Sequence, residues 1–88
     1  MASRTELQLR WLYTCTGLSY RKIAAGTGIS HSTVNRWMRF SRVPSARNEA
    51  RIDSFVQEVI SQKKYLKSFD TFRKEYYDSI NDPVYGRH

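Results

Sequence analysis

The sequence predicts an all-α fold: a three-helix core followed by two further amphipathic helices, all in one domain. Apolar residues recur at helical spacing along most of the chain. Serine residues stand just before several of these stretches, where a side-chain hydroxyl can cap a helix. No segment alternates apolar and polar residues in the manner of a half-buried strand. A chain of 88 residues can bury one modest hydrophobic core.

The first helix is expected over residues 4–16. Ser3 and Glu6 have the spacing of a capping box, in which a serine and a glutamate side chain satisfy N–H groups at the helix start. The side of this helix that faces the core carries Leu7, Trp11, Leu12 and Cys15. Because Cys15 is the single cysteine of the chain, the sequence predicts a small core residue in a reducing compartment and no disulfide framework.

Residues 18–39, LSYRKIAAGTGISHSTVNRWMR, predict two short helices joined by a tight turn. Ser19 can cap the first of these helices, which we expect to cover residues 20–25. Gly26 is expected to keep this helix short, because a glycine inside a helix costs about 1 kcal/mol relative to alanine.

The turn itself is expected at Gly28, a residue type that tolerates positive φ, with Ile29 as its apolar plug. Ser30 can cap the second helix. The apolar side of that helix carries Val34, Trp37 and Met38. Its opposite side carries the hydrogen-bonding side chains His31, Ser32, Asn35, Arg36 and Arg39. A helix with these two faces suits the edges of base pairs in a major groove.

This segment resembles the helix-turn-helix family of DNA-binding proteins. In that family a small residue inside the first helix is followed four residues later by a glycine in the turn, and six further on by a branched aliphatic residue. Ala24, Gly28 and Val34 stand at these separations. The sequence pattern I-A-x-x-x-G-I-S-x-x-T-V-x-R-W is also similar to the motif of bacterial regulators, resolvase-type DNA-binding domains and transposases. The resemblance implies that the second motif helix enters the major groove of duplex DNA.

The family pattern implies a set of site residues. Those expected to reach base edges are Ser30, His31, Ser32, Asn35 and Arg36. Those expected to contact phosphates are Tyr20, Arg21, Lys22, Thr27, Thr33, Arg39 and Arg42. Among the first set, Arg36 can donate to O6 and N7 of guanine, and Asn35 can bond N6 and N7 of adenine.

The distribution of charge supports an anionic partner independently of the motif. The chain has a net charge of +7. Residues 1–47 hold eight basic side chains and a single acid, Glu6, whereas residues 48–88 hold seven side chains of each sign. The whole positive excess therefore lies in the half that contains the motif, as expected for a phosphate-binding face.

Two more helices are expected after Pro44. One, over residues 46–63, carries Ile52, Phe55, Val56, Val59 and Ile60 at the spacing of a buried stripe. Ser68 can cap the other, which carries Phe69, Phe72, Tyr76 and Ile80 and ends near Pro83. We therefore divide the chain into a DNA-binding core (1–43), a helical extension (44–82) and a tail (83–88).

The extension has two interpretations, which the sequence leaves open. It either completes the core of the protomer or forms a dimer interface. The residues considered for dimerisation are Ile52, Phe55, Val56, Val59, Phe69, Phe72 and Tyr76.

The resemblance implies a sequence-specific transcriptional regulator, most simply a repressor that binds an operator as a homodimer, of the small type found in bacteriophages and mobile elements. We expect no catalytic residues, no metal, no cofactor, no small-molecule ligand and no membrane segment, and a cytoplasmic protein that joins the nucleoid when bound to DNA. One alternative is a DNA-binding accessory factor for recombination, transposition or genome packaging. Another is a basic protein-interaction module that binds an acidic partner.

Overall fold

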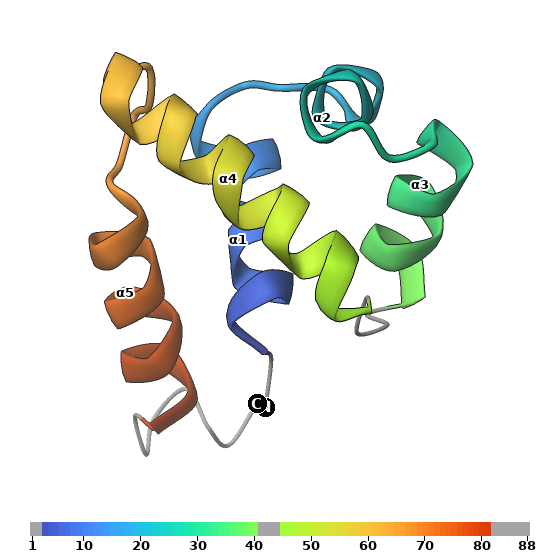
Figure 1. The fold of residues 1–88 in the computed structure, drawn as a ribbon. Helices are drawn as coiled ribbons and strands as arrows, with labels where there is room; N and C mark the ends of the chain where they lie inside the picture. The colour runs from blue at the N-terminus through green and yellow to red at the C-terminus, as the bar shows by residue number, and fades with distance from the viewer. Residues whose placement is uncertain (1–2, 41–44, 82–88) are drawn as a thin grey trace.

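The computed structural model describes residues 3–40 and 45–81. This part of the chain folds into α-helices and contains no strand, which confirms the all-α prediction (Figure 1). The helices are α1 (Arg4–Cys15), α2 (Tyr20–Thr27), α3 (His31–Phe40), α4 (Ala46–Gln62) and α5 (Phe69–Asn81).

Serine capping fixes the starts of several helices, as the sequence predicts. Three serine hydroxyls each accept a hydrogen bond of 3.2 Å from a backbone N–H three residues on: Ser3 from Glu6, Ser19 from Lys22 and Ser68 from Thr71. Ser45 also has the extended backbone of a cap, but its side chain makes no capping hydrogen bond. Glu6, the expected second member of the capping box, forms an ion pair with Arg10 at 3.5 Å.

The ends of α1 and α4 differ by one residue from the expected ones. α1 ends at Cys15, and the chain then turns through Gly17, whose φ is 71°. α4 ends at Gln62 because Lys63 adopts a left-handed conformation, with a φ of 54°. The backbone N–H of Lys63 donates to the carbonyl of Ile60 at 3.0 Å and closes the last turn.

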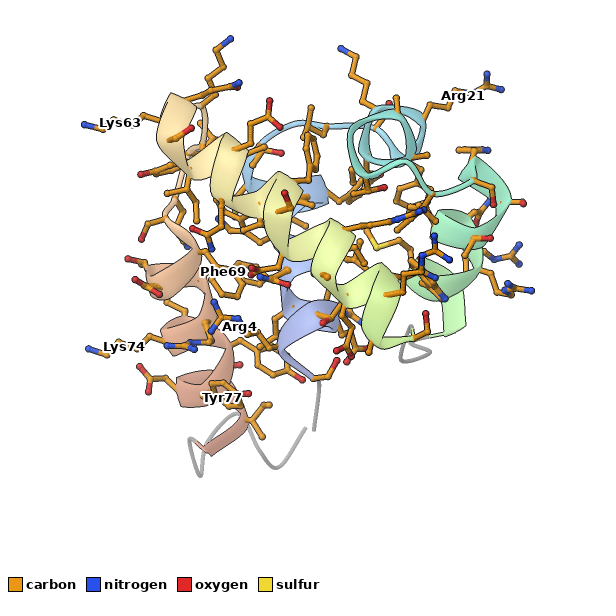
Figure 2. All side chains as sticks on the ribbon, viewed as in Figure 1. Arg4, Arg21, Lys63, Phe69, Lys74 and Tyr77 are labelled. Carbon is orange, nitrogen blue, oxygen red and sulfur yellow. The ribbon has the colours of Figure 1, made fainter. Side chains whose placement is uncertain are left out.

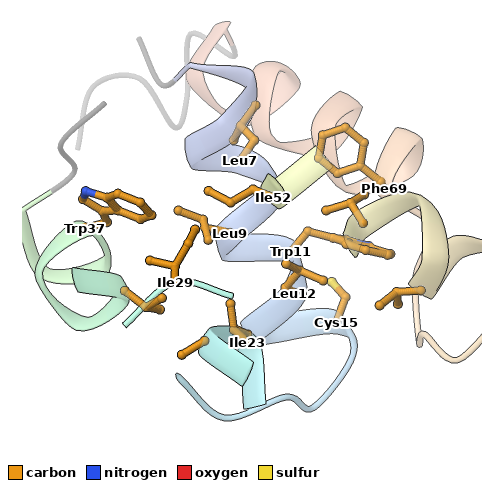
Figure 3. Packing of buried hydrophobic residues seen from close by; sticks show 14 residues of the cluster. Leu7, Leu9, Trp11, Leu12, Cys15, Ile23, Ile29, Trp37, Ile52 and Phe69 are labelled. Atoms are coloured by element: carbon orange, nitrogen blue, oxygen red, sulfur yellow. The ribbon is translucent and has the colours of Figure 1, made fainter. Parts of the chain in front are cut away.

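α4 crosses the molecule and packs on both α1 and α2 (Figure 1). The core that results contains side chains from every helix, and Figure 3 shows its centre. Fully buried members are Leu7, Trp11, Leu12, Ile23, Val34, Ile52 and Val56. The extension therefore shares one core with the first three helices.

Four of the residues considered for dimerisation belong to this core. Ile52, Val56, Val59 and Phe69 are 0%, 0%, 6% and 4% exposed within the protomer. A partner chain could not reach them in this conformation. Their burial matches the other interpretation, in which the extension completes the core.

The segment between α4 and α5 is tied to α1 by two hydrogen bonds. The indole Nε1 of Trp11 donates to the carbonyl of Lys67, and the N–H of Leu66 donates to the carbonyl of Cys15, both at 2.7 Å. The Trp11 ring also lies against Phe69, with ring centroids 5.9 Å apart. These contacts hold α5 beside α1, on the opposite side of the molecule from α3 (Figure 1). Within the described residues, no helix is both long enough and apolar enough to cross a membrane.

Candidate nucleic-acid interface

The turn between α2 and α3 is built around the carbonyl of Ala24. The N–H groups of Gly28 and Ile29 both donate to it, at 2.9 and 3.2 Å. Gly28 takes the left-handed conformation expected for it, with a φ of 76°. Ile29 is buried in the core, which confirms it as the apolar plug of the turn.

α2 extends to Thr27, two residues beyond the expected end at Ala25. The expectation failed because Gly26 continues the helix instead of ending it. Thr27 is only 6% exposed, and its hydroxyl donates to the carbonyl of Ile23 at 2.8 Å. Thr27 therefore stabilises the last turn of α2, and its hydroxyl cannot reach a phosphate in this conformation.

The start of α3 is held by a cluster of hydroxyls. The Ser30 hydroxyl accepts from the backbone N–H of Thr33 at 3.3 Å, as a cap should. It also lies 2.7 Å from the hydroxyl of Thr33 and 3.4 Å from that of Ser32. Ser30 and Thr33 are thus engaged in capping, although both were expected at DNA.

α3 has one buried face and one exposed face. Val34 and Trp37 pack into the core. Ser32, Arg36 and Arg39 are exposed and follow one another at i, i+4 and i+7, so they form one row along the outer side of the helix. His31 and Asn35 lie beside this row at i and i+4; His31 is exposed and Asn35 is half-buried.

The residues expected at phosphates are not all exposed. Arg21 and Lys22 are exposed in the first turn of α2, and Figure 2 shows Arg21 extending away from the molecule near α3. Tyr20 is half-buried, and its ring lies 4.8 Å from that of Tyr13, measured between centroids. Arg42 lies outside the described residues.

Arg51 of α4 lies at the turn between α2 and α3, although neither the motif nor the charge pattern of the sequence indicates it. Its Nη1 donates to the carbonyl of Gly28 at 3.3 Å, which brings the side chain from α4 to the turn between α2 and α3. The net charge of residues 48–88 is zero, so the excess of positive charge in the first half gave no reason to consider Arg51. The i, i+4 spacing of Arg47 and Arg51 on one side of α4 is the signal that could have revealed it.

Two acidic residues of α4, Glu49 and Asp53, lie on the side of the helix that faces α1. Asp53 accepts a hydrogen bond from Nε2 of Gln8 in α1 at 2.8 Å, and Glu49 lines the same shallow depression as Gln8 and Asp53. The chain contains no acidic residue between Glu6 and Glu49, so α2 and α3 carry only positive charges. The exposed cations of α2, α3 and the first half of α4 are together called the basic face below; they are Arg21, Lys22, Arg36, Arg39, Arg47 and Arg51.

Residues 3–40 and 45–81 contain no cluster of three or more His, Cys, Asp or Glu side chains that could hold a metal ion. The chain matches no protein-family model, no curated protein and no solved structure.

Proposed function

We propose that the chain is a sequence-specific duplex DNA-binding protein in which α2, the turn and α3 act as a helix-turn-helix. The observation that carries the proposal is the exposed row of Ser32, Arg36 and Arg39 on a helix that, like α2 before it, contains no acidic residue. A surface with an excess of positive charge attracts a polyanion, and polar side chains on an exposed helix can read base edges.

α3 has dimensions suited to a major groove. Its ten residues span about 15 Å at the rise of an α-helix, and a B-DNA major groove of about 12 Å admits one helix. Arg36, in the middle of the exposed row, is the proposed reader of guanine, and Asn35 beside it the proposed reader of adenine. Each such bidentate pair discriminates against a wrong base by about 1–3 kcal/mol.

The remaining cations of the basic face are assigned to the DNA backbone. Arg21 and Lys22 are exposed at the start of α2, and a short first motif helix next to the reader is a common source of phosphate contacts. Each phosphate neutralised by these side chains releases condensed counterions, so binding should weaken steeply with salt.

The protein acts on DNA as a homodimer in this proposal. One motif helix reads about four base pairs, a site that recurs roughly once in 256 positions, which is too frequent for useful selection. Two copies on an inverted repeat remove this problem. Phe72 and Tyr76 remain available for the contact, because both are only partly buried and line a mostly apolar groove of about 380 Å³. The other residues of this groove are Arg10, Tyr13, Thr14, Tyr20 and Met38. Occupation of an operator would block transcription, which makes a repressor the simplest role.

Selection of bound sequences from random duplex DNA, at near-physiological salt, tests the proposal. An enriched inverted repeat with half-sites about ten base pairs apart is the expected result. Single or directly repeated sites would replace the repressor with an accessory factor for recombination, transposition or packaging. No enrichment would overturn sequence-specific recognition and favour a basic module that binds an acidic protein.

A further inference from the structure

We propose that α4 carries a second set of phosphate contacts, with Arg51 as the main ligand and Arg47 beside it. This inference rests on the proposed DNA binding and extends it to a helix outside the motif. The two arginines would bind phosphates of the DNA backbone beside the groove that α3 enters. Both lie outside the helix-turn-helix segment.

The hydrogen bond from Arg51 to Gly28 fixes where the guanidinium lies. Nη1 is 3.3 Å from the Gly28 carbonyl oxygen, so the positive charge of Arg51 lies at the turn that leads into α3. A guanidinium has five N–H donors, and a bond to one carbonyl leaves the others available. Arg51 is an exposed residue, so these donors are accessible from solvent. The hydrogen bond places the guanidinium beside the turn before any phosphate binds, and a side chain held in place in advance loses less entropy on binding.

Arg47 lies one helical turn before Arg51 on the same side of α4 and is also exposed. Two like charges at i and i+4 repel each other, and a cation in the first turn of a helix opposes the macrodipole. Neither arginine forms an ion pair with a carboxylate of the described residues, and Asp53 and Glu49 lie on the α1 side of the helix. The repulsion between the two arginines and the unfavourable interaction of Arg47 with the macrodipole both destabilise the free protein. A bound polyanion would offset both.

A purely structural role for Arg51 predicts a different behaviour. If the side chain only ties α4 to the turn, its removal lowers the free energy of unfolding without changing how DNA binding depends on salt. If it neutralises a phosphate, its removal reduces the number of counterions released on binding. The salt dependence of binding separates the two roles.

The experiment measures the dissociation constant of the full chain for its selected duplex and for an unrelated duplex, over a series of salt concentrations. For Arg51→Gln we expect the slope of log Kd against log salt to fall by about one, with both duplexes weakened alike. Arg47→Gln should act in the same way, and the double variant should lower the slope by about two. Arg51→Lys, which keeps the charge, should retain most of the slope.

Lys74→Gln is the matched control, because it removes one exposed positive charge from α5, on the opposite side of the molecule from α3 (Figure 2). Its slope should equal that of the original protein. Unchanged slopes for both arginine variants, in a protein that binds DNA, would overturn this inference and leave the proposed function standing. Failure of the original protein to bind duplex DNA would overturn both. If Arg51→Gln unfolds, Arg47→Gln decides the matter, since the Arg47 side chain makes no hydrogen bond to the described residues.

Discussion

Gly26 of α2 lies directly against the ring of Phe55 of α4. A Cβ atom at position 26 would lie 2.8 Å from Cδ1 of that ring and closer still to Cε1 and Cζ, distances that real atoms do not adopt. The glycine that seemed only to weaken α2 thus allows α4 to pack closely on it. Because α2 leads directly into the turn before α3, this contact helps to position α3 and its exposed row of side chains.

Substitution of Gly26 by alanine should destabilise the protein, although alanine is the better helix former. The helical preference favours alanine by about 1 kcal/mol, whereas forcing an extra methyl group into packed side chains costs about 1–3 kcal/mol. We expect a net loss of up to about 2 kcal/mol in the free energy of unfolding, measured by chemical denaturation. In a Phe55→Ala background the same change should instead stabilise the fold by about 1 kcal/mol. A stabilising effect in both backgrounds would show that the ring moves aside without cost.

Arg36→Ala and Arg21→Ala should affect DNA binding in different ways. Arg36 lies in the exposed row of α3, so its loss should cost about 1–3 kcal/mol on the selected site and relax the preference at one base position. Arg21 lies at the start of α2, so its loss should weaken all duplexes alike and lower the salt slope by about one. Competition binding against a panel of single-base variants measures both effects. If both variants lost the same affinity for every duplex, the proposal that Arg36 contacts a base would be wrong.

The division of the extension into core and surface residues can be tested with Ile52 and Tyr76. Ile52 is fully buried in the protomer, so Ile52→Val should lower the free energy of unfolding by about 0.5–1.5 kcal/mol and leave the dimer dissociation constant unchanged. Tyr76 lines the apolar groove, so Tyr76→Ser should weaken self-association in analytical ultracentrifugation. Monomers for the unchanged protein at all concentrations, with and without DNA, would contradict the proposed dimer.

Local chemistry explains what the sequence predicted well. Caps at Ser3, Ser19 and Ser68 depend on one hydroxyl and a backbone N–H three residues away, so residue type and spacing predict them, whereas Ser45 precedes α4 in the same way and makes no such hydrogen bond. Gly28 was predictable for a similar reason, since few other residues adopt positive φ without strain. The apolar faces of the helices follow from spacing alone, and the core contains Val34 and Ile52 as expected.

The features that sequence reasoning missed depend on contacts between distant parts of the chain. Thr27 was assigned to a phosphate by its place in a motif, but its hydroxyl bonds to its own helix, an alternative open to any threonine near a helix end. The approach of Arg51 to Gly28 and of Phe55 to Gly26 depends on how α4 crosses α2, and periodicity within one helix contains no information about that crossing. The sequence therefore predicted which side of each helix is buried and which is exposed. It did not predict which residues of different helices come together at the candidate site.

The pairing of Lys67 with Glu75 gives the structure a pH-dependent contact at the start of α5. The Lys67 ammonium donates to Oε2 of Glu75, and this hydrogen bond raises the pKa of Lys67 above its ordinary value. Because the pKa is raised in the folded state, the pair stabilises the protein below the pKa that Lys67 has in the unfolded chain, and the contribution disappears as the pH rises through the folded pKa. The effect on stability should be small, since both side chains are substantially exposed.

Glu75→Gln should therefore lower the pKa of Lys67, which an NMR titration of the lysine side chains measures directly. The melting temperatures of the original protein and the variant should differ slightly near neutral pH and converge in strongly alkaline solution, where Lys67 is uncharged in both. Lys74→Gln serves as the control, because it removes a charge from the same helix without touching the pair. A Lys67 titration unchanged by Glu75→Gln would show that the two side chains do not pair in solution.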